Sequence, residues 1–301
     1  MQSLSRGWSF LTEAWKMARA DKDLIKPSIY ALLVGFVVSL IGIIPIVLAV
    51  VIFGGENLIG RIILGVLGAL LVFAQYAVTY IFSAMTVSLI YGYLTKGDGR
   101  MEEAWDMVKH DWLNLLSLAA ASTLVNIIKN TVAGNSRNGN PIGKAIAGLI
   151  DTVWTEATYL VLPIMVIEDS NLKDGLKRAT HIVKNNLMLV GISTVGVRWM
   201  TGLIGFVLGL VGILLGIGIA YPIINLAGDS LILIVVAVVL GVLVASIFFM
   251  VAAVINSYTS TAYHTCLYLW ARDVEKAQAG QQAGIPAQVV APQPLAAALG
   301  N

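Results

Sequence analysis

Six long runs of apolar residues constrain the fold of this chain more than any other feature. The runs cover residues 27–53, 62–93, 112–128, 145–167, 187–220 and 231–262. A helix of about 20 apolar residues crosses the hydrocarbon core of a bilayer, so each run is of spanning length. The third run is the weakest, because Asn114, Ser117 and Asn126 dilute it. We predict an all-α polytopic membrane protein with six transmembrane helices in three hairpins.

The composition agrees with this class and excludes several functions. Hydrophobic residues make up 58% of the 301 positions and charged residues only 12%. A soluble protein of this length would need a larger share of polar residues to cover its surface. The net charge of +2 gives no indication of a nucleic-acid partner. The single cysteine, Cys266, excludes an internal disulfide, and the three histidines lack metal-ligand spacing. The sequence contains no recognisable catalytic motif. We therefore expect no catalytic residues, no enzyme activity, no metal and no cofactor.

The distribution of lysine and arginine predicts the orientation. With six spans, fourteen of the 19 basic residues lie on the side of both termini, and four lie in the loops of the other side. Because basic loops stay in the cytoplasm, we predict that both termini are cytoplasmic.

A weak threefold repeat divides the chain. Residues 13–21 read EAWKMARAD, residues 103–111 read EAWDMVKHD, and residues 174–182 read DGLKRATHI. Two apolar runs follow each copy, which predicts three units starting near residues 8, 101 and 170, each opening with an amphipathic helix on the cytoplasmic side. We expect Trp8, Trp15 and Trp105 at headgroup depth. The three units form one domain, residues 1–276, and the uncharged segment 277–301 is expected to be a disordered tail.

A stripe of glycines marks the fifth run. The stripe comprises Gly191, Gly202, Gly205, Gly209, Gly212 and Gly216. From Gly202 onward the glycines are spaced by three and four residues, which places them on one face of a helix. Glycines at this spacing allow close packing of membrane helices. The stripe either packs against another helix of the same chain or supports an oligomeric pore. We expect a homo-oligomer.

Three ionisable residues lie deepest in the runs: Asp151, Glu156 and Arg198. Glu156 and Arg198 each lie about 16 Å from the nearer end of their run, which brings both close to the midplane. We hypothesise that these two form an ion pair. Asp151 is about 140° around the helix from Glu156, so we expect it to face an outer aqueous cavity. The three charges either mark an ion or proton path or form a structural ion pair with a wet acid beside it.

The second span of each hairpin also becomes polar toward the cytoplasm. Two such groups stand out, Thr79, Ser83, Thr86, Ser88 and Tyr91, and then Ser257, Thr259, Ser260, Thr261 and His264. They indicate either a hydroxyl-lined vestibule or hydrogen bonding between helices.

The segment LPIMVIEDSNLKDGLKRATHIVKNN, residues 162–186, resembles a pattern in a broad group of prokaryotic six-span proteins. That group includes the membrane domain attached to some glycerophosphodiester phosphodiesterases. The opening residues 3–32 are similar to one uncharacterised family of the group. The resemblance implies a multi-pass protein of the prokaryotic cell membrane, without the phosphodiesterase activity, because no soluble catalytic domain is present in the sequence.

Two functions fit these observations. The first is a channel or transporter-like protein with Arg198, Glu156 and Asp151 on or near the conduction path. The alternative is a non-transporting scaffold or lipid-binding protein, with membrane lipids and a cytoplasmic protein as partners. A conducting protein needs a water-accessible route past Arg198, whereas a scaffold would bury this residue in a dry pair.

Overall fold

Helices account for nearly all of the chain in the computed structural model, which describes residues 2–54, 57–134, 141–185, 187–228, 230–280 and 290–299. In these segments there is no β-strand, so the predicted all-α class is confirmed. The helices are α1 (Gln2–Ala20), α2 (Lys26–Phe53), α3 (Leu58–Lys96), α4 (Met101–Gly134), α5 (Pro141–Glu168), α6 (Leu172–Asn185), α7 (Leu187–Ala227), α8 (Leu231–Gly280) and α9 (Gln293–Leu299).

Six of these helices are long and apolar enough to cross a membrane, as predicted. The candidate spans are Lys22–Phe53, Leu58–Lys96, Met101–Gly134, Pro141–Glu168, Trp199–Leu226 and Leu231–Ala277. The apolar side chains of α2 and of the outer halves of α7 and α8 are largely exposed. Exposed apolar surface of this extent is unfavourable in water and suits contact with lipid.

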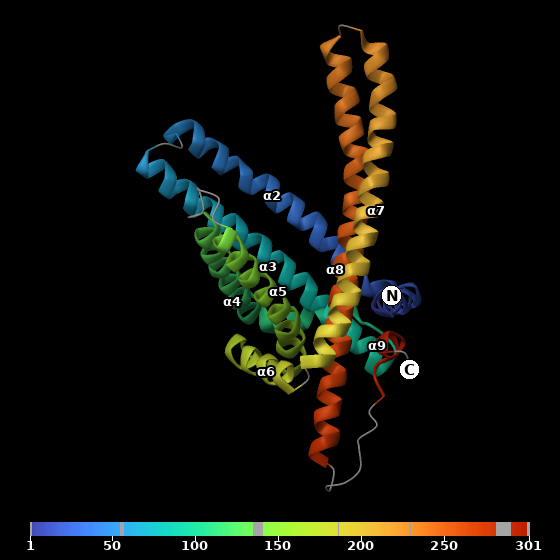
Figure 1. Cartoon of the computed structure of the whole chain (residues 1–301). Helices are drawn as coiled ribbons and strands as arrows, with labels where there is room; N and C mark the ends of the chain where they lie inside the picture. The colour runs from blue at the N-terminus through green and yellow to red at the C-terminus, as the bar shows by residue number, and fades with distance from the viewer. Residues whose placement is uncertain are drawn as a thin grey trace.

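The spans form three antiparallel hairpins, α2–α3, α4–α5 and α7–α8 (Figure 1). The hairpins α2–α3 and α7–α8 lean away from each other, and α4 and α5 pack beside α3. At 41 and 50 residues, α7 and α8 are about 60 and 75 Å long, so this hairpin extends well beyond the others. Figure 1 shows α1 nearly end-on, transverse to α7 and α8, and α6 running across the ends of α4 and α5.

The largest completely buried side chains lie on the inner half of α8. Its Tyr258, Tyr263 and Tyr268 are completely buried. The Tyr258 hydroxyl donates a hydrogen bond to the carbonyl oxygen of Ala14 in α1 (2.9 Å), and the Tyr263 ring meets Phe10 edge-on with centroids 5.2 Å apart. The Tyr268 hydroxyl donates to Glu168 Oε1 at the end of α5 (2.6 Å). This part of α8 therefore joins the first and second units of the chain.

The cytoplasmic helix expected at each of the three repeats is separate in only two of them. Between α1 and α2 the chain breaks, because Asp21 accepts hydrogen bonds from the backbone N–H groups of Asp23 (2.9 Å) and Gly99 (2.8 Å), and Pro27 then opens α2. Between Met101 and Gly134 there is neither proline nor internal glycine. The second copy of the repeat consequently continues without a break into the span α4, which corrects the expectation of a separate helix there.

The tail also differs from its expected disorder over part of its length. Residues 293–299 form α9, in which Leu295 is completely buried and Ala291, just before the helix, is 6% exposed. The helix packs against α1. Its apolar side chains find a partner surface that the composition of the tail does not reveal. Residues 281–289 lie outside the described segments.

The tryptophans expected at the interface occupy different surroundings. Trp8 and Trp105 are 53% and 40% exposed, and their contact with headgroups stays a prediction. Trp15 instead packs edge-on against Tyr258 with centroids 5.9 Å apart. The buried face of α1 is centred on Phe10 and Ala14 rather than on Trp8.

The glycine stripe of α7 divides into two parts. A Cβ atom built on Gly209, Gly212 or Gly216 would lie within 3 Å of atoms of α8, the nearest being the carbonyl oxygen of Gly241, 2.5 Å from Gly216. A Cβ atom on Gly202 or Gly205 would meet no atom within 4 Å. The outer part of the stripe is therefore an intrachain contact between α7 and α8. The surroundings of Gly191 lie outside what the structure describes.

Exchanging these glycines for alanine is expected to have opposite effects along the stripe. Gly216→Ala places a methyl group against the backbone of Gly241 and should destabilise the protein by about 1–3 kcal/mol. Gly202→Ala gains helix propensity in open space and should leave stability unchanged or raise it by about 1 kcal/mol. Thermal unfolding in detergent measures both. An equal decrease for the two variants would contradict the close approach of α7 and α8.

Candidate functional site

A polar cavity of about 290 Å³ lies among α3, α4, α5 and α8. Most of its polar lining consists of hydroxyl, phenol and amide groups, contributed by Tyr76, Thr79, Tyr80, Ser83, Ser122, Asn126, Thr155, Thr158, Tyr159, Asn256, Ser257 and Thr261. Several of these residues belong to the polar second spans of the first and third hairpins. These groups line the cavity together, and some of them also form hydrogen bonds within their own helices.

An ion pair stands at the end of this cavity that lies toward the end of α4 and the start of α5. The Lys129 Nζ atom of α4 lies 2.8 Å from Asp151 Oδ1 of α5. The Asp151 side chain is 58% exposed and that of Lys129 is 24% exposed, so the cavity reaches the surface of the molecule here. Asp151, expected to face an outer cavity, is one of its lining residues.

Ser122 of α4 is the central hydrogen-bonding group of the cavity wall. Its hydroxyl oxygen accepts a hydrogen bond from Trp154 Nε1 of α5 (2.9 Å) and shares a hydrogen bond with the Tyr80 hydroxyl of α3 (2.6 Å). The ring of Tyr80 stacks on that of Tyr76, with centroids 5.9 Å apart. Three spans therefore meet at one buried hydroxyl group, which fixes the shape of the wall.

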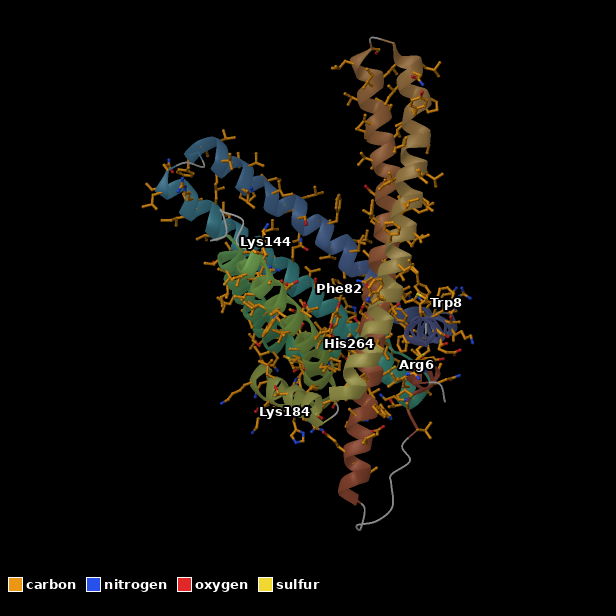
Figure 2. The ribbon with its side chains drawn as sticks, in the orientation of Figure 1. Arg6, Trp8, Phe82, Lys144, Lys184 and His264 are labelled. Carbon is orange, nitrogen blue, oxygen red and sulfur yellow. The ribbon has the colours of Figure 1, made fainter. Side chains whose placement is uncertain are left out.

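His264 and Glu156 face each other beside the inner part of the cavity. His264 Nδ1 is 2.7 Å from the carbonyl oxygen of Ser260, and since a carbonyl only accepts, this nitrogen carries a hydrogen. The other ring nitrogen, Nε2, lies 3.5 Å from Glu156 Oε2. The His264 ring stacks on Tyr159, with centroids 4.5 Å apart. Figure 2 shows His264 at a level between Lys144 and Lys184, which belong to α5 and α6.

Of the three charged residues singled out in the sequence, the structure describes the side-chain surroundings of two. Asp151 pairs with Lys129 and lines the cavity, and Glu156 lies against His264. The side chain of Arg198 lies outside the described part of the chain, and with it the hypothesis of a pair between Arg198 and Glu156. Lys129 and His264 were not expected as partners of these acids. Lys129 could have been found, because it and Asp151 occupy the facing ends of two helices joined by a short outer loop.

A second charged group lies where α6 meets the ends of α5 and α8. Arg178 of α6 forms ion pairs with Glu275 of α8 and with Glu168 at the end of α5 (3.4 Å to the latter). Burial by itself lowers the pKa of Arg178, but the hydrogen bond and charge of Glu275 together with Glu168 outweigh it and raise this pKa above its ordinary value. The guanidinium group therefore stays charged and connects the last two hairpins.

One set of side chains has the geometry to hold a cation. Ligand atoms of His110, Asp111 and Asp169 lie within 4.8 Å of one another, with Asp111 buried and the other two exposed. Exposed acidic groups commonly gather in this way without a metal. The cluster does not by itself define a metal site.

Comparison with known proteins identifies a family but no activity. Residues 62–278 match the model of a family of unknown function, DUF6159. The match covers more than half of the chain, so the chain belongs to this family. No curated protein matches it. The resemblance to an uncharacterised family is supported, whereas no link to glycerophosphodiester phosphodiesterases is found.

Removing the Ser122 hydroxyl is expected to weaken the cavity wall. Ser122→Ala leaves Tyr80 and Trp154 without their shared partner and should lower the free energy of unfolding by about 1–3 kcal/mol. Ser117→Ala is the matched control on α4, since that hydroxyl bonds only to the nearby Asn114 carbonyl oxygen among the described contacts. Unfolding followed by tryptophan fluorescence measures both variants. Equal stability of the two would show that Ser122 does not join the three spans.

Proposed function

We propose that this member of DUF6159 is a channel or transporter-like protein that admits small hydrophilic solutes into the cavity among α3, α4, α5 and α8. The observation that carries the proposal is the polar lining of that cavity within helices of membrane-spanning length. Hydroxyl, amide and charged groups are costly in hydrocarbon unless water or protein satisfies them. A wet pathway explains why so many are gathered among four spans.

The outer mouth in this proposal is the end that carries Lys129 and Asp151. The excess of basic residues on the opposite side supports a cytoplasmic location for both termini and for α6. We place the protein in a prokaryotic cell membrane, with lipids around the exposed apolar faces. The open part of the glycine stripe, Gly202 and Gly205, supports association of copies into a homo-oligomer. We propose no enzymatic step for any residue.

A lipid-binding or scaffolding role is the second candidate, and α6 is the observation that favours it. One face of α6 is buried through Ala179 and Ile182, while Lys173, Lys177 and Lys184 are exposed. A basic exposed face on such a helix attracts anionic headgroups or an acidic partner. This role requires no water in the cavity, so water access separates the two candidates.

Cysteine accessibility tests the proposed pathway. The only cysteine, Cys266, is buried and gives a low background for new cysteines. Thr155→Cys places a thiol on the cavity wall, and Val153→Cys, two residues away, places one on an apolar surface position that is 67% exposed. A thiol reacts as the thiolate, which forms in water and not in hydrocarbon. A membrane-impermeant methanethiosulfonate should therefore modify Thr155→Cys at least about tenfold faster than Val153→Cys in intact vesicles.

The same measurement can contradict the proposal. If both cysteines stay unmodified while a cysteine at exposed Asp98 reacts in permeabilised vesicles, the cavity is dry. A dry cavity would leave the lipid-binding or scaffolding role as the better description.

A further inference from the structure

The charges that line the cavity neutralise each other. Lys129 and Asp151 are the two charged side chains of the described lining, and they are hydrogen-bonded at 2.8 Å. Deeper in the cavity, the described polar lining consists of hydroxyl, phenol, indole and amide groups, and the nearby Glu156 carboxylate faces His264 and is not part of the lining. An ion that entered would lose hydration without meeting an uncompensated opposite charge among these groups, which is unfavourable.

The neutral groups offer both donors and acceptors of hydrogen bonds. The hydroxyls of Thr79 and Thr158 donate to backbone carbonyl oxygens of their own helices, at 2.8 and 2.9 Å, so their oxygen atoms remain acceptors. The amide of Asn256 and the hydroxyls of Ser83 and Ser257 add groups that can donate or accept. A mixed pattern of this kind matches solutes whose own groups both donate and accept.

Aromatic rings form the remaining walls. The stacked rings of Tyr76 and Tyr80 lie on one side, and Trp154 and Tyr159 line the α5 side. Such rings bring an apolar face together with a polar tip, so they can contact the C–H groups of a solute while hydrogen-bonding its polar groups. The volume of about 290 Å³ corresponds to about ten water molecules. The cavity therefore suits a molecule of glycerol or urea size better than a large metabolite.

We infer that the substrate class of this cavity is small uncharged solutes that carry hydroxyl or amide groups, and not inorganic ions. The inference rests on the proposed function, because it names what passes through the same site. The pair of Lys129 and Asp151 at the mouth presents both signs of charge to an approaching solute. It therefore favours neither a cation nor an anion and leaves selection to the neutral groups behind it.

The test measures solute and ion permeability on the same preparation. The full chain is reconstituted into phosphatidylcholine vesicles, and influx of glycerol and of urea is followed by stopped-flow light scattering. Potassium and chloride currents are recorded in planar bilayers. We expect influx of at least one solute to exceed that of protein-free vesicles by about tenfold or more, with no ion current above background.

A matched pair of variants assigns the flux to the cavity. Thr155→Phe fills the cavity and should lower solute influx by about tenfold, whereas Val153→Phe, on the exposed apolar surface, should leave it within about twofold. Size-exclusion chromatography checks that both variants fold. If Thr155→Phe does not fold, the comparison of solute with ion in the unmodified protein still decides the question.

The outcomes separate the inference from the proposed function. An ion current without solute influx would overturn the neutral-solute class and leave a conducting protein in place. The absence of both solute influx and ion current would overturn the substrate class. The cysteine modification would then decide whether the cavity is a pathway at all. Equal solute influx in both phenylalanine variants would show that the flux bypasses the cavity and would also overturn the inference.

Discussion

The contact between the inner half of α8 and the two earlier units is the interaction on which the rest of the structure depends. Tyr258, Tyr263 and Tyr268 of α8 meet α1 and the end of α5. A phenolic ring contributes a large apolar area, and its hydroxyl finds a partner when buried. Because these contacts fix α8, its neighbouring positions Asn256, Ser257 and Thr261 close one side of the cavity.

The spans and the class of fold could be predicted because they depend on local properties, namely the length and apolar character of each run. The breaks between helices were harder. The EAW segments at 13–21 and 103–111 share five residues of nine, yet one ends at a break and the other continues into a span. The difference arises in the residues after each segment, since Asp21 precedes a capped turn and Pro27, while Asp111 precedes an unbroken run without proline. The α9 helix could not be predicted, because its stability comes from α1, at the opposite end of the chain.

The types of residue in the candidate site could be predicted from the sequence, but most of the contacts between these residues could not. Asp151 and the hydroxyl groups of α3 and α8 were identified from their unusual positions in apolar runs. The partners of Ser122 and Glu156 depend on how the hairpins turn toward one another, so their contacts with Tyr80 and His264 appear only in three dimensions. Matched depth led to the hypothesis of a pair between Glu156 and Arg198. Depth alone leaves the rotation of each helix undetermined. His264 faces Glu156 in the structure, and the pair with Arg198 stays a prediction, because that side chain lies outside the described part of the chain.

The packing of the first helix has a consequence for biosynthesis. The surface of α1 that includes Phe10 and Ala14 is covered by Tyr258 and Tyr263, and α9 packs on the same helix. The covering residues lie far downstream of α1 in the sequence, so they are synthesised long after it. At a synthesis rate of about 5–20 residues per second, α1 therefore lacks these partners for roughly ten seconds or more. During this interval the newly made α1 has the membrane surface as its available apolar partner, so insertion and final assembly are separated in time.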